Sequence, residues 1–120
     1  MRFMMIRRAD TVSEAGVTPN SEMMAAMDQY ASDMSKAGIL VTGEGLKPSA
    51  QGTRVRFNNG TPTVFDGPFT ETKELIAGYF IIDVKSKEEA IQWTKRWPAI
   101  ASDANVELEL RPFYEAADFE

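Results

Sequence analysis

The chain has 120 residues, a net charge of −5 at neutral pH, and neither cysteine nor histidine. This length fits one domain with an ordinary core, and the acidic balance argues against nucleic acid and anionic membranes as partners. The two missing residue types exclude disulfides, thiol nucleophiles, Ser-His-Asp triads and metal sites built on thiolate or imidazole. Any acid–base chemistry must therefore use Asp, Glu, Lys or Tyr side chains, or a bound cofactor.

The first strand is predicted at residues 2–8, where residues 3–6 are all apolar and indicate burial on both faces. This segment is too short and too charged for a secretory signal, and no stretch approaches the ~20 apolar residues of a membrane span. We therefore expect a cytoplasmic protein. Residues 9–20 are predicted to form a polar connection.

Residues 21–37 predict an amphipathic helix, because apolar side chains recur at intervals of three or four residues. Ser21 or the Thr18-Pro19 pair is expected to begin the helix, and Gly38 to end it as a C′ glycine. We interpret its methionines as core residues in preference to a flexible ligand pocket. The inner side chains are Met23, Met27, Tyr30 and Met34.

A hairpin is predicted in the middle of the chain, after a second strand at residues 39–46. Residues 53–57 alternate polar and apolar side chains, which predicts a half-buried strand. The Asn59-Gly60 pair that follows is a strong hairpin signal, because a type I′ turn needs positive φ at both central residues. Residues 61–65 are the expected returning strand.

The second half repeats the strand-helix-strand order. Residues 66–69 predict a rigid loop followed by a short helical turn at 70–74, and residues 75–84 predict a strand that is apolar on both faces. Ser86 and Glu89 form a capping box that begins a second helix, expected to end near Trp97-Pro98. A last strand is predicted at 106–111, and residues 113–120 are an acidic tail with aromatic side chains.

This element order predicts an α+β domain over residues 1–112, with a ferredoxin-like antiparallel sheet and two helices on one face. A sheet face that meets water should alternate polar and apolar residues, yet the strands at 2–8 and 75–84 are apolar on both faces. A large exposed apolar face indicates an interface. We therefore expect a homodimer that packs sheet against sheet about a two-fold axis.

The most specific motif is the run Asp-Gly-Pro-Phe-Thr-Glu-Thr-Lys-Glu at residues 66–74, continued by Ile-Ala-Gly-Tyr-Phe at 76–80. It resembles the signature of the YCII-related family, in particular its DGPF branch. The resemblance extends through residues 37–48 and 86–93 to the closing strand, and so covers nearly the whole chain. It implies a dimeric α+β barrel, in agreement with the homodimer inferred from the sheet.

The resemblance implies less about activity. Most relatives have no assigned reaction, and one is a dehydrochlorinase. Members of the DGPF branch are often encoded beside extracytoplasmic-function sigma factors. YCII-type relatives were proposed to use an Asp–His pair, but that mechanism cannot be transferred to Asp66 because this chain has no histidine.

Asp66 is the candidate catalytic residue, as a general base desolvated by Phe65 and Phe69. The alternative, which we favour, is a carboxylate that caps N–H groups of the Gly-Pro turn. Glu44 lies between two glycines on an apolar strand, so it points into a cavity or pairs with Arg54 or Arg56. The full candidate ligand-binding set is Glu44, Asp66, Gly67, Pro68, Phe69, Glu71 and Lys73.

Glu71 and Lys73 either contact a ligand beside Asp66 or form a solvated first turn, where the helix dipole favours Glu71. No Asp-x-Asp loop supports a Mg²⁺ or Ca²⁺ site, and we expect neither metal nor cofactor. The leading hypothesis is a homodimeric small-molecule-binding domain with a regulatory role linked to a sigma factor. The alternatives are a lyase or isomerase that acts on a small cyclic or phenolic compound through Asp66, and a protein-interaction module.

Overall fold

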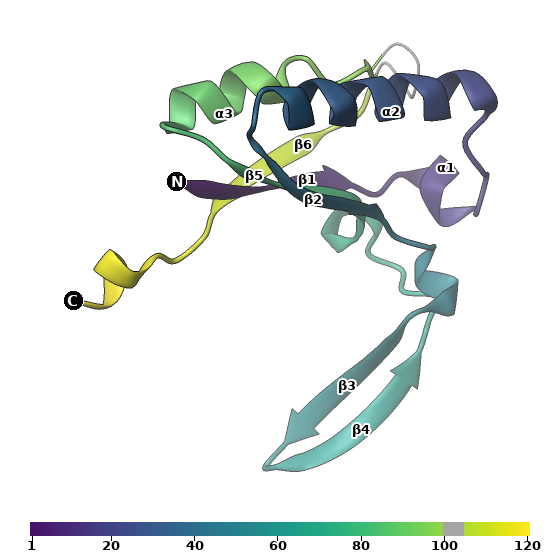
Figure 1. Cartoon of the computed structure of the whole chain (residues 1–120). Coiled ribbons are helices and arrows are strands. Elements are labelled where there is room, and N and C mark those ends of the chain that lie inside the picture. Colours follow the sequence, from purple (N-terminus) through teal and green to yellow (C-terminus); the bar gives the residue numbers. More distant parts are fainter. Residues whose placement is uncertain (100–104) are drawn as a thin grey trace.

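A computed structural model of the chain describes residues 1–99 and 105–120, with the side chain of Lys73 outside that description. Within these residues, a 4-stranded antiparallel sheet has the order β2-β5-β1-β6, and β3 and β4 form a separate 2-stranded sheet (Figure 1). The strands are β1 Arg2–Arg8, β2 Leu40–Gly45, β3 Thr53–Asn58, β4 Thr61–Asp66, β5 Ile76–Asp83 and β6 Leu108–Pro112. The helices are α1 Thr11–Glu14, α2 Ser21–Lys36 and α3 Lys87–Thr94, with 3-10 turns η1 Ser49–Gln51, η2 Thr72–Glu74 and η3 Ala116–Phe119.

The core lies between the larger sheet and the two longer helices, α2 and α3, which cover one of its faces (Figure 1). On that face of β1, Phe3 is paired with Ile82 and Met5 with Phe80. These findings confirm the α+β class, the antiparallel sheet and the placement of both helices on one face. The buried apolar side chains are Phe3, Met5, Tyr30, Met34, Ile39, Ile82, Val84 and Ala90.

The ends of α2 follow from local hydrogen bonding. Its N-cap is Asn20, whose side chain accepts a hydrogen bond from the backbone N–H of Met23 at 2.7 Å. Of the two predicted starts, Ser21 is confirmed as the first residue of the helix and Thr18-Pro19 is not; the capping side chain is that of Asn20, because an asparagine oxygen caps as well as a serine hydroxyl. Gly38 has a φ of +76° and ends the helix as predicted.

Tyr30 joins the two helices across the core. Its hydroxyl donates a hydrogen bond to the carbonyl oxygen of Trp93 at 2.7 Å, and its ring meets Phe80 and Trp97 edge-on at centroid distances of 5.8 and 5.7 Å. Burial raises the pKa of this phenol well above that of an exposed tyrosine. The positive charge of Arg96 acts in the opposite direction but offsets only part of the increase. The interpretation of Met34, on the same helix face, as a core residue is confirmed.

Three boundaries differ from the sequence predictions. Within the expected polar connection, α1 forms because the Asp10 side chain caps it by accepting a hydrogen bond from the backbone of Ser13 at 2.7 Å. The helix expected to end near Trp97 is α3, and it ends at Thr94. The chain beyond it has the tighter 3-10 pattern, because the N–H groups of Arg96 and Trp97 donate to carbonyl oxygens three residues earlier. The last strand begins at Leu108, two residues later than expected.

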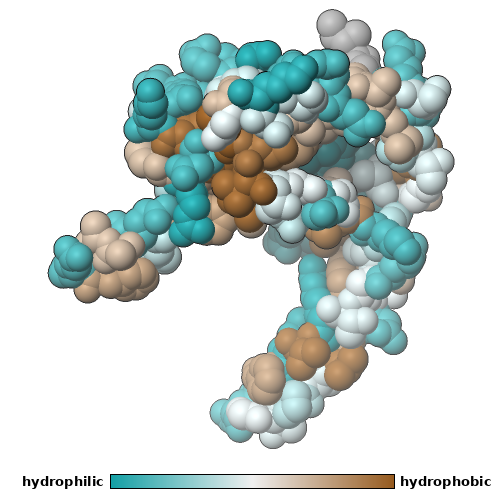
Figure 2. Space-filling view, viewed as in Figure 1, coloured by the Kyte–Doolittle hydropathy of each residue, from teal (hydrophilic) through white to brown (hydrophobic). Residues whose placement is uncertain are grey.

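The hairpin of β3 and β4 projects away from the larger sheet, and we call residues 53–66 the arm (Figure 1). Its turn is confirmed, since Asn59 and Gly60 have φ values of 51° and 80°. The prediction of a half-buried strand was wrong, because every residue of both strands is exposed. The alternation is present, but no other part of the described chain covers its apolar side (Figure 2).

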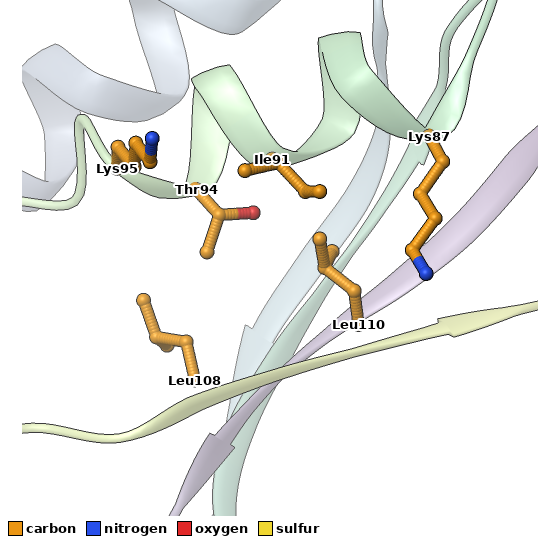
Figure 3. Close-up of a pocket in the computed structure, with 6 residues that line it drawn as sticks. All are labelled: Lys87, Ile91, Thr94, Lys95, Leu108 and Leu110. Carbon is orange, nitrogen blue, oxygen red and sulfur yellow. The ribbon is translucent and has the colours of Figure 1, made fainter.

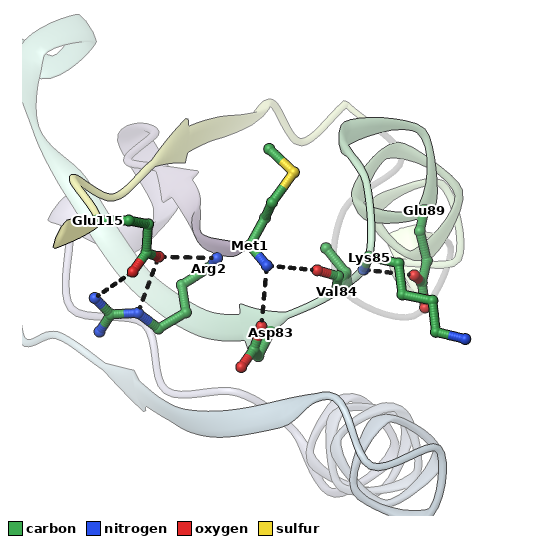
Figure 4. A network of polar contacts seen from close by, with 7 residues as sticks. All are labelled: Met1, Arg2, Asp83, Val84, Lys85, Glu89 and Glu115. Carbon is green, nitrogen blue, oxygen red and sulfur yellow. Dashed lines mark hydrogen bonds and ion pairs between the residues drawn. The ribbon is translucent and has the colours of Figure 1, made fainter. Parts of the chain in front are cut away.

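The C-terminal residues 113–120, which we call the tail, form a second projection (Figure 1). Its base is tied to the first strand, since the Arg2 guanidinium meets the Glu115 carboxylate at 3.3 Å (Figure 4). The N-terminal ammonium group is held beside it, donating a hydrogen bond to the Val84 carbonyl oxygen at 2.7 Å. The same ammonium lies 3.3 Å from the Asp83 carboxylate.

These projections make the molecule more open than a compact monomer. Its radius of gyration is 16.3 Å, whereas about 13.6 Å is typical of a compact domain of this length. The chain exposes 8386 Å² of surface, whereas a monomer of this mass exposes about 6,500 Å². Roughly 1,900 Å² per chain therefore lies exposed beyond what the mass requires.

Candidate functional site

The loop of the DGPF motif, residues 66–69, is anchored by two segments far away in the sequence. The Ser49 hydroxyl accepts a hydrogen bond from the backbone N–H of Phe69 at 3.0 Å and donates a short hydrogen bond to the Glu14 carboxylate. Glu14 also accepts the backbone N–H of Ser49 at 3.0 Å. The loop, expected to be rigid from Gly67 and Pro68, is thus held by long-range hydrogen bonds as well as by its own residues.

Gly67 is needed in this loop because of a close approach. A Cβ atom there would overlap the carbonyl oxygen of Ser49, and its φ is not in the left-handed region. The Gly67 N–H donates a hydrogen bond to the Gly52 carbonyl oxygen at 2.9 Å. The backbones of residues 49–52 and of the motif therefore pack directly together.

Asp66 is exposed at the base of the arm, at the end of β4. Its carboxylate accepts a hydrogen bond at 3.1 Å from the hydroxyl of Thr53, its cross-strand partner. The hydrogen bond found for the Asp66 carboxylate is thus with a side chain across the hairpin. The sequence favoured a different partner, the backbone N–H groups of the Gly-Pro turn.

The other candidate residues around the motif do not converge on one point. The half-buried ring of Phe69 lies under the Arg54 guanidinium, with 3.8 Å between the ring centroid and Cζ. Arg54 is therefore engaged with Phe69. Among the described residues, no ion pair between Arg54 and Glu44 is found. Pro68 and Glu71 are exposed. Lys73, also a candidate, has its side chain outside the described part of the chain.

Glu44 lies on the sheet face that the helices do not cover, which we call the open face. On this face its register partner is Tyr79 of β5, and Tyr79 is in turn paired with Ile6 of β1. Directly opposed residues on antiparallel strands have Cβ atoms about 4.5–5.5 Å apart. The carboxylate and the phenol therefore stand side by side, next to an apolar strip on the two central strands β1 and β5, while Glu109 and Arg111 of β6 make the opposite edge of the face charged.

The apolar residues of the open face follow from the register. Since Phe3 and Met5 face the helices, their neighbours Met4 and Ile6 face the opposite way. The half-buried apolar members are Met4, Ile6, Ala77 and Ile81. Sequence reasoning missed Tyr79 as a functional candidate, although a phenol on an otherwise apolar strand face was the signal that could have found it.

An apolar groove of about 360 Å³ lies elsewhere, between α3 and the edge strand β6 (Figure 3). Its volume suits a small ligand, and Lys87 and Lys95 lie at its two ends (Figure 3). The Thr94 hydroxyl is already engaged, donating to the Ala90 carbonyl oxygen at 2.7 Å. The groove therefore lacks the converging polar groups that fix a ligand. Its other lining residues are Ile91, Leu108 and Leu110.

A second cavity of about 380 Å³ is lined by the end of β1 and by residues 105–107. Its charged groups are used structurally: Arg8 pairs with Glu109 at 3.4 Å, and Asp10 caps α1 and pairs with Arg7 at 3.2 Å. The Ser13 backbone hydrogen bond is the main cause of the lowered pKa of Asp10. Neither of these two cavities includes a residue that the sequence singled out for the site.

Across the described residues, no helix is long and apolar enough to cross a membrane. One curated relative, an uncharacterised protein of Rhizobium meliloti (strain 1021), is 37% identical over 60 residues. That match covers 50% of this chain and 48% of the relative, so it spans about half the length of each.

Among solved structures, 5-chloro-2-hydroxyhydroquinone dehydrochlorinase from Burkholderia phenoliruptrix AC1100, in complex with 2,5-dihydroxybenzoquinone, aligns over 98% of both chains. It has 13% sequence identity and a TM-score of 0.43, too low to carry an argument. The decisive comparison is with a family: the YCII-related domain matches residues 1–114. The chain therefore belongs to the YCII-related domain family.

Proposed function

We propose that this protein is a homodimer that binds a small hydroxylated aromatic or cyclic compound between the open faces of its two sheets. The proposal rests above all on the pairing of Glu44 with Tyr79 on the open face. A ligand site combines apolar walls with a few placed polar groups. The open face has both, and a second sheet would supply the opposite wall.

The homodimer is supported by the shape of the chain. The open face carries an apolar strip on its central strands, formed by Met4, Ile6 and Ile81, without any helix over it, and an uncovered apolar surface is a mark of an interface. The roughly 1,900 Å² of surplus surface per chain is of the size that obligate dimers bury. A two-fold axis lying between two open faces would cover this surface on both chains.

The ligand class follows from the two polar groups. The Glu44 carboxylate accepts hydrogen bonds, so it favours a ligand that carries a hydroxyl donor, while the Tyr79 phenol both donates and accepts. Apolar neighbours suit a ring. Enclosure by a second sheet would strengthen these hydrogen bonds, because they would no longer compete with bulk water.

The test is a thermal-shift comparison of phenol and catechol with anisole, which has a similar ring but no hydroxyl donor. Phenol and catechol are expected to raise the melting temperature, since a ligand that binds only the folded state stabilises it. Glu44→Gln is expected to weaken their apparent affinity by about tenfold, because the ligand hydroxyl then donates to a neutral amide oxygen in place of a charged carboxylate.

Glu22→Gln is the matched control, since Glu22 lies on α2, on the opposite side of the sheet. It should leave the response unchanged. An unchanged melting temperature for both phenolic probes, or an equal response of Glu44→Gln and the unaltered chain, would contradict the proposed site. Sedimentation equilibrium of the ligand-free protein tests the homodimer separately.

We further propose that the chain belongs to the DGPF branch, on the strength of the motif at residues 66–69, and that ligand binding serves a regulatory role linked to a sigma factor. The anchoring of that motif by Ser49 and Glu14 supports an architectural task for it. A scaffold that holds its loops rigid is suited to recognising a ligand.

The second candidate function is an enzyme that acts through Asp66 as a lyase or isomerase. Its support is weaker, because Asp66 is exposed and its carboxylate is hydrogen-bonded to Thr53, whereas a general base works best when partly desolvated. If a turnover is found, Asp66→Asn decides the matter: unchanged turnover would remove Asp66 from the mechanism.

A further inference from the structure

The arm has two unlike faces. Val55 is paired with Val64 and Phe57 with Pro62, so these four apolar residues share one face. Val55, Phe57 and Val64 are exposed by 55%, 68% and 63%. On the other face Arg56 lies over the ring of Phe65 at 4.8 Å, so that face already has packing of its own.

An arm of this kind needs a partner for its apolar face. An isolated two-stranded hairpin is marginally stable in water at best, and becomes stable when its apolar face packs on another element. No described part of the same chain covers that face, and the space-filling view shows the arm standing clear of the body with apolar side chains on its surface (Figure 2). The covering element must therefore come from another molecule.

The tail has the same deficiency. Tyr114 and Phe119 are each 76% exposed, and the ring contact found for them among the described residues is with each other, with centroids 5.2 Å apart. The base of the tail is fixed, because the Phe113 N–H donates a hydrogen bond to the Arg2 carbonyl oxygen at 3.0 Å, next to the Arg2–Glu115 ion pair (Figure 4). The tail therefore presents an aromatic surface at a defined place.

Arm and tail of one chain leave the sheet from opposite corners. The arm follows β2, an outer strand, whose last residue Gly45 is paired with Gly78 near the end of β1. The tail follows β6, the other outer strand, whose last residue Pro112 is paired with Phe3 near the start of β1. Both project on the side of the sheet away from α2 and α3 (Figure 1).

We propose that the arm of each copy packs its apolar face against the tail of the second copy. This inference rests on the homodimer proposed above and specifies its outer contacts. Consider a two-fold axis that lies between the two open faces, along the diagonal that joins the two corners without arm or tail. This axis places the arm corner of one copy over the tail corner of the other. The dimer then contains two identical arm-to-tail contacts, one at each end.

Charge favours this pairing over the two other symmetric ones. The arm carries Arg54 and Arg56, whereas the tail carries carboxylates. Both arginines lie on the arm face opposite to the apolar one, so their charge acts across the thickness of the hairpin, within a Debye length of roughly 8 Å. Arm against arm would bring two basic elements together and tail against tail two acidic ones, which is unfavourable. Arm against tail brings a basic element next to an acidic one. The tail carboxylates are Glu115, Asp118 and Glu120.

The absence of cysteine from the chain makes the contact directly testable. Val64→Cys on the arm and Ala116→Cys on the tail, both exposed positions, are coexpressed with different tags and treated with a short bis-maleimide. A cross-linked species of twice the 13.4 kDa chain is expected from the pair. Each variant alone should give none, because arm does not meet arm and tail does not meet tail.

Lys36→Cys, at the end of α2 on the helix side, replaces the tail variant as the matched control and should give no cross-link with the arm. A dimer in sedimentation equilibrium without the arm-to-tail product overturns the arm contact while leaving the homodimer standing. A monomer overturns both. An equal yield of cross-linked product with Lys36→Cys and with Ala116→Cys also contradicts the contact. Such a product would come from random encounters between molecules in solution.

A second measurement asks whether the contact contributes to affinity. Phe57→Ser is expected to raise the dimer dissociation constant at least about tenfold, because it removes an exposed aromatic anchor of the arm. Met24→Ser changes another exposed apolar residue, on α2 and 55% exposed, and should leave the constant within about twofold. Equal effects of the two substitutions would contradict the proposed role of the arm.

Discussion

The hydroxyl of Ser49 donates a hydrogen bond to the carboxylate of Glu14, which lies 35 residues earlier in the chain. The same carboxylate accepts the Ser49 backbone N–H, and the same hydroxyl accepts the backbone N–H of Phe69. One glutamate on a one-turn helix therefore determines where the DGPF motif sits. No periodicity or motif in the sequence connects these residues.

Glu14→Ala is expected to lower the free energy of unfolding by about 1–3 kcal/mol, because both Ser49 donors lose a charged acceptor. Urea denaturation measures the change. Glu74→Ala, an exposed glutamate, is the control and should stay within about 0.5 kcal/mol. Equal effects of the two would mean that the Glu14 network adds nothing to stability.

Gly67→Ala is expected to destabilise the protein by at least about 1–3 kcal/mol, since a Cβ atom there meets the Ser49 backbone carbonyl and backbone yields little. Gly45→Ala adds the same methyl group where no atom lies within 4 Å, and should be neutral or slightly stabilising. Melting temperatures of the two variants measure the difference. The close packing of residues 49–52 on the motif is refuted if they coincide.

Tyr30 predicts a pH dependence at the alkaline end. Burial raises its folded-state pKa above the ordinary value of 10.0, so the unfolded chain loses this proton first as the pH rises. Its contribution to stability is full below pH 10.0 and declines above it, by up to about 1.4 kcal/mol per pH unit. Tyr30→Phe should remove this component of the decline, measured by urea denaturation between about pH 9 and about pH 11.

The start of α2 predicts a contrast between two neighbouring residues. Asn20→Ala removes the side chain that caps the Met23 N–H, and should cost about 1 kcal/mol of stability. Ser21→Ala changes an exposed residue inside the first turn and should change stability by less than about 0.5 kcal/mol. Thermal denaturation compares them, and the reverse order would return the N-cap to Ser21.

Local signals predicted most of the fold. Consecutive apolar residues identified β1 and β5, the Asn59-Gly60 pair located the hairpin turn, and Gly38 marked the end of α2. Each of these depends on residues close together in the chain. The errors arose where tertiary contacts decide: the alternation of β3 predicted a half-buried strand, but burial depends on what lies opposite, and the described chain places nothing there.

The candidate site was predictable only in part. Glu44 stood out because it lies between two glycines, and the structure explains one of them: a Cβ on Gly43 would overlap the ring of Phe80. Its partner Tyr79 depends on strand register, which no local pattern determines. The rigidity expected of the Asp66 loop stays a prediction, and the anchors that hold the loop come from residues 14 and 49, which no local pattern could indicate.

The central position of β1 has a consequence for how the chain folds during synthesis. During synthesis β1 is made before both of its partners, β5 and β6, so Arg2 cannot pair until Asp83 is made, nor Phe3 with β6 until Pro112 is made. Contacts between such distant residues slow folding. This apolar strand therefore has no partner until β5 is made, and it stays half-paired until β6 is made; during that time it is exposed to aggregation and to chaperones.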